Sequence, residues 1–259
     1  MLCLPGLTRN CRDFEALAPH LCSNGKRTVL TPDFRGRGRS AYDPDWRNYR
    51  PEVYVRDVLA LLDSTALRRV IVIGTSLGGI VGMFLASLFP DRVAGLVLND
   101  IGPELEVAGM VRIASTAGKA RAATTWAEAA ADARAGNAHA YPDFSEADWM
   151  TFAHRVYRED RPGQIIRDVD SNVGRAIREP VGAPTGTVPD FWKAFDSLSR
   201  VPLLCLRGEL SDLLSVETVT RMAAHHAGMQ CREISHRGHA PTLDEPESRA
   251  AIDAFIEAL

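Results

Sequence analysis

Twenty consecutive residues, from Val70 to Phe89, carry no charge and are mostly apolar. A stretch of this length and composition could cross a bilayer as a single helix. It also holds glycines at Gly74, Gly78 and Gly82, a spacing with which membrane helices pack against one another. The alternative is that the stretch divides into a buried strand, a tight turn and a buried helix. The two interpretations lead to different kinds of protein.

The composition within the stretch favours the division. Val70–Ile73 is an unbroken β-branched run, which suits a strand buried on both faces of a parallel sheet. Gly74–Gly79 includes three glycines, which are poor helix formers. From Leu77 onward apolar residues recur at helical spacing until Pro90. Strand, tight turn and helix are the context in which a Gly-x-Ser-x-Gly sequence forms a nucleophile elbow, so Ser76 is the predicted nucleophile.

The remaining composition is that of a globular protein. The 259 residues are 46% hydrophobic and carry a formal net charge of −3, which indicates neither a nucleic-acid partner nor a membrane surface. Five cysteines without CxxC spacing predict no metal site and suit a reducing compartment. No signal peptide and no second candidate span is evident. We therefore expect a soluble, cytoplasmic protein.

Ser76 requires a base and an orienting acid, because a serine hydroxyl alone is a weak nucleophile. In a fold with this elbow, the acid and then a histidine follow the serine along the chain. Asp212 lies in the loop after a predicted strand at Val201–Leu206, and His239 lies in a glycine-containing loop before a predicted last helix at Glu247–Leu259. We therefore predict a catalytic triad of Ser76, Asp212 and His239.

Four motifs in order along the chain resemble those of the α/β-hydrolase family. They are the elbow around Ser76, the DFRGRGRS sequence at Asp33–Ser40, the VLNDIGP sequence at Val97–Pro103 and the GHAPTLDEP sequence around His239. The resemblance implies an α/β-hydrolase fold with a mostly parallel, doubly wound sheet. It also implies hydrolysis of a small-molecule carboxylic ester through an acyl-enzyme, with no cofactor and no metal.

The triad acid has an alternative. The loop that holds Asp212 is similar to the usual acid loop of the family, which is why Asp212 is preferred. Some relatives instead use an acid after the strand that follows the elbow helix, and Asp100 lies at that position. Both aspartates follow predicted strands, so Asp100 stays open as the second candidate.

Two backbone N–H groups are expected to bind the oxyanion of the tetrahedral intermediate. One is the amide of Leu77, directly after Ser76. The resemblance places the other in the loop Leu4–Thr8, where this chain has a proline in place of the relatives' histidine. We assign Leu7, with Gly6 as the near alternative.

Strand signals vanish between residues 104 and 194, whereas Thr125–Ala135 and Glu146–Tyr157 have helical composition. The family carries a helical cap at this point, so we expect residues 104–194 to be a cap and residues 1–103 and 195–259 to form the core. The aromatic residues of the cap could line an acyl pocket or pack the cap against the core. Its arginines are interleaved with acids, which indicates a solvated face (Arg155, Arg158, Arg161, Arg167, Arg175 and Arg178).

Only Met1–Leu4 precede a loop that follows three strands in relatives. We therefore expect the sheet to lack the first one or two strands of the family, which leaves an edge that a homodimer could cover. The substrate is expected to be a small ester or lactone. The same triad would also serve a lactonase, a C–C bond hydrolase of ring-cleavage products or an acyltransferase, and the fold also serves ligand receptors without turnover.

Overall fold

The computed structural model describes residues 1–23, 25, 27–118, 122–179 and 189–259. A five-stranded sheet forms its centre, and every neighbouring pair of strands in it is parallel. The strands, in spatial order, are β1 (Leu2–Leu4), β2 (Val70–Thr75), β3 (Val93–Asn99), β6 (Leu203–Gly208) and β7 (Gln230–Ile234). A single parallel bridge joins Leu30 to Leu2 beside β1. The expected parallel sheet is confirmed.

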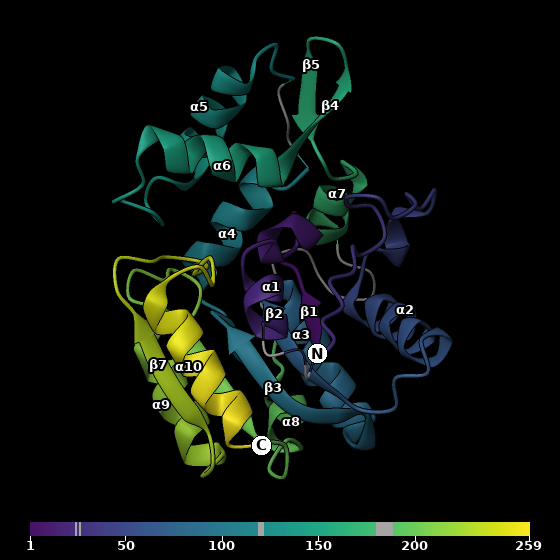
Figure 1. Ribbon diagram of the computed structural model, residues 1–259, viewed down its shortest axis with the longest axis vertical. Helices are drawn as coiled ribbons and strands as arrows, with labels where there is room; N and C mark the ends of the chain where they lie inside the picture. The colour runs from purple at the N-terminus through teal and green to yellow at the C-terminus, as the bar shows by residue number, and fades with distance from the viewer. Residues whose placement is uncertain (24, 26, 119–121, 180–188) are drawn as a thin grey trace.

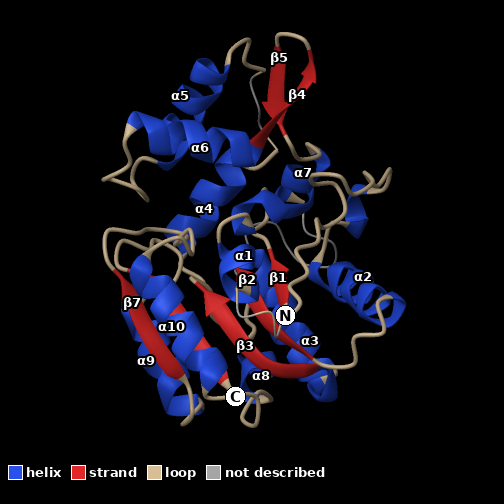
Figure 2. Ribbon diagram, viewed as in Figure 1, coloured by secondary structure: helices blue, strands red, loops and turns tan. Residues whose placement is uncertain are grey.

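Helices connect these strands and cover the sheet (Figure 2). They are α1 (Leu17–Cys22), α2 (Pro51–Ser64), α3 (Leu77–Leu88), α4 (Val107–Thr116), α5 (Trp126–Asn137), α6 (Glu146–Val156), α7 (Asn172–Arg178), α8 (Trp192–Asp196), α9 (Val216–His225) and α10 (Pro246–Glu257). Short 3₁₀ turns lie at Cys11–Phe14, Trp46–Asn48 and Pro90–Arg92.

The strands are buried on both faces, as their continuous apolar sequences predict. Successive side chains of a strand point to opposite faces, so one strand serves two apolar layers. In β3, Leu96 and Leu98 belong to the layer that holds α2, α3, α8 and α9, whereas Val97 between them belongs to the layer that holds α1 and α10. The sheet is therefore doubly wound.

The uncharged stretch Val70–Phe89 is divided as the sequence indicates. Strand β2 ends at Thr75 and helix α3 begins at Leu77, so the chain turns at Ser76. In the described part of the chain, no helix combines the length and the apolar character that crossing a membrane requires. The single-helix interpretation of this stretch is wrong.

Residues 126–167, which we call the 126–167 segment, lie together at the top of the view in Figure 1. They hold α5 and α6, close to the predicted helical stretches, and an antiparallel hairpin of β4 (Tyr157–Arg161) and β5 (Gln164–Arg167). The expectation that this region holds no strands was therefore wrong. Residues 119–121 and 180–188 of the expected cap lie outside the described residues, and the division at residues 104 and 194 stays a prediction.

Candidate active site

The elbow holds Ser76 in a backbone conformation that L-residues rarely adopt. Its φ is 51°, and its N–H donates to the Asn99 carbonyl at 3.0 Å. A Cβ on Gly78 would lie 2.1 Å from the Leu4 carbonyl oxygen, and one on Gly74 would lie 2.4 Å from the backbone of Gly78. The two glycines therefore let β1, β2 and α3 approach closely enough to present the serine at the strand end.

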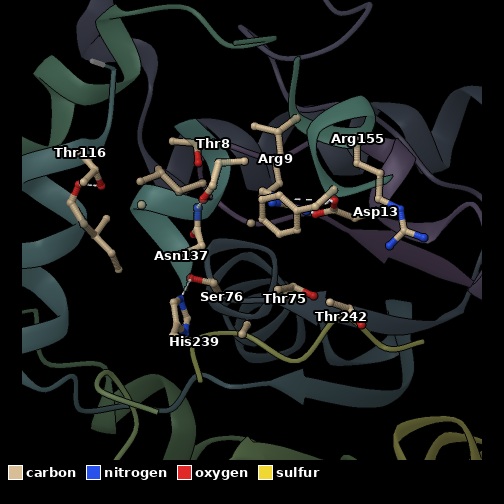
Figure 3. A pocket seen from close by; sticks show the side chains of 18 of the residues that line it. Thr8, Arg9, Asp13, Thr75, Ser76, Thr116, Asn137, Arg155, His239 and Thr242 are labelled. Atoms are coloured by element: carbon tan, nitrogen blue, oxygen red, sulfur yellow. Dashed lines mark hydrogen bonds and ion pairs between the residues drawn. The ribbon is translucent and has the colours of Figure 1, made fainter. Parts of the chain in front are cut away.

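Three side chains meet at this edge of the sheet. The Nε2 atom of His239 lies 2.8 Å from Ser76 Oγ, and its Nδ1 atom lies 2.8 Å from Asp100 Oδ2 (Figure 3 shows the serine–histidine contact). The His239 side chain is 8% exposed and that of Asp100 is fully buried. Because a carboxylate only accepts hydrogen bonds, Nδ1 carries the proton and Nε2 is left to accept from the serine hydroxyl.

The structure does not bring Asp212 to His239, so the predicted acid was wrong. Instead, Asp212 accepts from Arg112 Nε at 2.5 Å and from Arg112 Nη2 at 2.7 Å. Partial burial would raise the pKa of Asp212, but the hydrogen bonds and positive charge of Arg112 outweigh it and hold that pKa below its usual value. The alternative acid, Asp100, occupies the place predicted for Asp212.

The Asp100 carboxylate accepts further hydrogen bonds besides the one from His239. Its Oδ1 atom accepts from the Gly208 N–H at 2.8 Å, and its Oδ2 atom also accepts from Ser211 Oγ at 2.7 Å. Its own φ of 55° is another left-handed backbone value. Three donors thus hold a carboxylate that has no access to solvent, which sets its orientation toward His239.

The two predicted oxyanion donors lie beside the serine. The Leu77 N–H is the first of α3, where helix amides have no intrahelical acceptor. Leu7 follows β1, and a Cβ on Gly6 would lie 3.8 Å from Ser76 Cβ, so this loop runs alongside the nucleophile. Within the described ranges, the amides of Leu7 and Leu77 donate no backbone hydrogen bond. They are available for an oxyanion.

Arg37 was missed by the sequence reasoning. Its side chain is fully buried, and its Nε atom donates to the Leu7 carbonyl at 2.7 Å, while Nη1 donates to the carbonyl of Arg35 and to the hydroxyl of Tyr54. Its position in the middle of the DFRGRGRS motif was visible in the sequence, but its contact with the Leu7 loop was not. Arg37 therefore fixes the peptide that follows the predicted oxyanion donor.

A cavity of about 150 Å³ lies against Ser76 and His239. One wall comes from the Leu7 loop, the elbow and the His239 loop, and the other comes from α4 and the 126–167 segment. Among the described residues, no cluster of three or more His, Cys, Asp or Glu side chains could hold a metal ion. A small ligand in this cavity therefore lies directly against the serine.

The aromatic residues of the 126–167 segment meet one of the two expected uses, because three of them line the cavity. Tyr141, Phe152 and Tyr157 line the cavity, whereas Trp149 is buried in the aromatic and alanine cluster of the segment itself. Burial raises the pKa of Tyr141 to about 12, so its hydroxyl keeps its proton and donates to the Ala240 carbonyl at 2.7 Å. This bond ties the segment to the loop that carries His239.

The model of a family described as the alpha/beta hydrolase family matches residues 1–252. This chain belongs to the α/β-hydrolase family. The 3-hydroxybutyrate-oligomer hydrolase of Cupriavidus necator is 31% identical to this α/β hydrolase, over 99% of this chain and 87% of that protein. Esterase Rv0045c of Mycobacterium tuberculosis is 27% identical, over 87% of this chain and 72% of that protein.

Solved structures agree with this assignment. An α/β hydrolase from Novosphingobium aromaticivorans superimposes with a TM-score of 0.90 at 44% identity, covering 100% of this chain and 89% of that one. The family and fold expected from the four motifs are therefore confirmed. The protein is a hydrolase whose relatives include enzymes named for ester hydrolysis.

Proposed function

We propose that this α/β hydrolase cleaves carboxylic esters of small molecules through an acyl-enzyme on Ser76. The observation that carries the proposal is the continuous hydrogen-bonded line from Ser76 Oγ through His239 to Asp100. This line supplies a nucleophile, a base and an orienting acid, which are the three parts that acyl transfer at a serine requires.

In the first half-reaction, His239 Nε2 accepts the hydroxyl proton as Ser76 Oγ attacks the carbonyl carbon of the ester. Asp100 holds the Nδ1 proton and stabilises the imidazolium that forms. The amides of Leu7 and Leu77 donate to the oxyanion of the tetrahedral intermediate. As the intermediate collapses, the C–O bond of the ester breaks, and the alcohol leaves with the proton from His239.

The second half-reaction reverses these roles with water. His239 takes a proton from a water molecule that attacks the acyl carbon, and the second tetrahedral intermediate is again bound by the two amides. Collapse breaks the bond between the acyl carbon and Ser76 Oγ, which recovers its proton from His239. The acid is released and the enzyme is restored.

The relative from Cupriavidus necator is named for hydrolysis of 3-hydroxybutyrate oligomers. Such oligomers are hydroxyacids joined by ester bonds, so their cleavage needs the chemistry proposed for Ser76. We therefore propose short hydroxyacid oligomers as the substrates to test first. Lactones and vinylogous diketones belong in the same panel, because the same triad would also act on them.

The test compares Ser76→Ala with the wild type and with Ser64→Ala, an exposed serine on α2. We expect Ser76→Ala to lower kcat for p-nitrophenyl butyrate by roughly a thousandfold or more. Ser64→Ala should retain wild-type turnover. Rapid acid quenching followed by mass spectrometry should find the acyl group on the peptide that contains Ser76. Full activity of Ser76→Ala, or acylation elsewhere, would contradict the proposal.

A further inference from the structure

The cavity beside the serine is lined by unequal numbers of opposite charges. Four arginines line it, Arg9, Arg112, Arg155 and Arg167, but the lining includes only one carboxylate, Asp13. Asp13 pairs with Arg9, while the carboxylates that pair with the other three arginines lie outside the lining. A ligand in the cavity is therefore closer to guanidinium groups than to most of their counter-ions.

Arg155 has unused hydrogen-bonding capacity at this wall. It comes from α6, its side chain is 14% exposed, and its Nη1 atom pairs with Asp244 at 2.7 Å. Its Nε atom is buried and has no hydrogen-bond partner among the described residues. A buried charged donor without an acceptor is costly, so an anion that reaches it gains a strong hydrogen bond.

Arg9 extends into the cavity from the loop that runs beside the nucleophile. A Cβ on Gly6 would lie 3.3 Å from Arg9 Cγ and 3.8 Å from Ser76 Cβ, so the two side chains start close together. The Arg9 guanidinium packs 4.2 Å from the Phe152 ring centroid, and its Nε and Nη2 atoms donate hydrogen bonds to Asp13. Its second terminal nitrogen, Nη1, makes no hydrogen bond within the described residues and can therefore bind a ligand.

Arg9 and Arg155 come from the two walls but lie near each other, because Phe152, against which Arg9 packs, is one helical turn before Arg155 on α6. In the view of Figure 3, Arg9, Asp13 and Arg155 are labelled on one side of the picture and His239 is labelled on the other, beyond Ser76. Two guanidinium groups that line one cavity can recognise a carboxylate with paired hydrogen bonds.

We propose that Arg9 and Arg155 bind a carboxylate of the substrate, at a distance from the ester bond that Ser76 attacks. This inference rests on the ester hydrolysis proposed above and narrows the substrate to anionic esters. A hydroxyacid oligomer with a free terminal carboxylate has that chemistry. The expectation of a solvated face does not hold for Arg155 and Arg167, which line the cavity.

The test uses two pairs of esters that differ only in the remote charge. In the first pair, the 3-hydroxybutyrate dimer and its methyl ester differ on the alcohol side of the scissile bond. In the second, p-nitrophenyl hydrogen adipate and p-nitrophenyl hexanoate differ on the acyl side. We expect the wild type to show a kcat/KM at least about tenfold higher for the charged member of one pair, because only that ester can form a hydrogen bond between charged groups.

Arg155→Gln should lower that ratio of kcat/KM values by roughly tenfold, as charge-assisted bonds of this strength imply. Arg9→Gln should do the same, and it is combined with Asp13→Asn so that no unpaired carboxylate remains. Arg175→Gln is the matched control, because Arg175 is exposed and lies outside the cavity lining. It should leave the ratio unchanged.

The outcomes separate the two proposals. If the neutral esters are hydrolysed as well as the charged ones and no arginine variant changes the ratio, carboxylate binding is refuted while ester hydrolysis stands. If none of the four esters is hydrolysed, the proposed function fails and this inference fails with it. A charge preference that Arg175→Gln removes as strongly as Arg155→Gln would also overturn the assignment.

Discussion

Replacing Asp100 by asparagine should stop catalysis by fixing the wrong tautomer of His239. The Oδ1 atom of Asp100 accepts from the backbone N–H of Gly208, which cannot itself accept, so an asparagine must keep its oxygen at that position. Its NH₂ group then takes the place of Oδ2, where it faces Ser211 Oγ and His239 Nδ1. A donor at this point forces the imidazole proton onto Nε2, which can no longer accept the proton of Ser76.

The size of the effect follows from the loss of both tautomer control and charge stabilisation. The same acid-to-amide change in a serine triad lowers kcat by roughly 10⁴-fold. At 1.36 kcal/mol per factor of ten, that corresponds to about 5.4 kcal/mol of transition-state stabilisation. The KM should change little, because Asp100 is buried behind His239 and is absent from the cavity lining.

Asp212→Asn is the matched control, since it makes the same change in a carboxylate that follows the neighbouring strand. Asp212 binds Arg112, and both side chains are partly exposed, so we expect kcat to fall less than about threefold. Steady-state kinetics with p-nitrophenyl butyrate would compare the two variants, with circular dichroism confirming that both are folded. The assignment of the acid would be refuted if a folded Asp100→Asn enzyme kept a tenth of wild-type kcat. It would also be refuted if kcat fell further in the Asp212→Asn enzyme than in the Asp100→Asn enzyme.

Three further changes test the support of the site. Gly78→Ala should lower the free energy of unfolding by about 3 kcal/mol or more in urea titrations, because its Cβ would collide with the Leu4 carbonyl. Arg37→Met should lower kcat by roughly tenfold at nearly constant KM, because the oxyanion donor on the Leu7 loop would be misplaced. The affinity for a trifluoromethyl ketone should fall by the same factor, and an unchanged kcat would count against this role of Arg37. Burial would raise the pKa of Glu245, but the hydrogen bonds that its carboxylate accepts, led by that from the Thr242 backbone, outweigh burial and lower this pKa. The stability that the ionised Glu245 contributes is therefore complete above about pH 4.5 and is lost as the pH falls. Glu245→Gln should therefore flatten the acid limb of unfolding free energy against pH, and an unaltered limb would show that other carboxyls dominate.

Local sequence was sufficient to predict the elbow and to select His239 as the partner of Ser76. The β-branched run, the spaced glycines and the helical periodicity around Ser76 all lie within twenty residues, so each of them could be recognised without knowing what packs where. His239 was equally accessible, because the motif around it follows a strand and precedes a helix. The structure brings these two residues to hydrogen-bonding distance.

The β4–β5 hairpin could not be predicted from its own residues. Its strands carry the sequences YREDR, four of whose five residues are charged, and QIIR, whose two isoleucines are adjacent, so neither strand shows the apolar–polar alternation of an independent strand. Ile165 is buried in the cluster of the 126–167 segment, and its backbone exchanges hydrogen bonds with Ala123. Tertiary context of this kind outweighs the local preference of a short polar strand.

The choice between the two aspartates lay beyond local patterns for a geometric reason. Strands β3 and β6 are parallel neighbours, and the N–H of Asp100 donates to the Leu206 carbonyl at 2.7 Å, so the exits of the two strands lie side by side. What distinguishes the two acids is a residue 100 positions before Asp212, because Arg112 on α4 holds Asp212 in an ion pair. The loop after β6 still serves the acid through Ser211, which donates to Asp100. One loop thus orients, through Ser211, the carboxylate that holds the histidine, and anchors, through Asp212, the helix α4 that lines the cavity. A change at Ser211 should therefore act on proton transfer, whereas a change at Asp212 should act on the cavity wall.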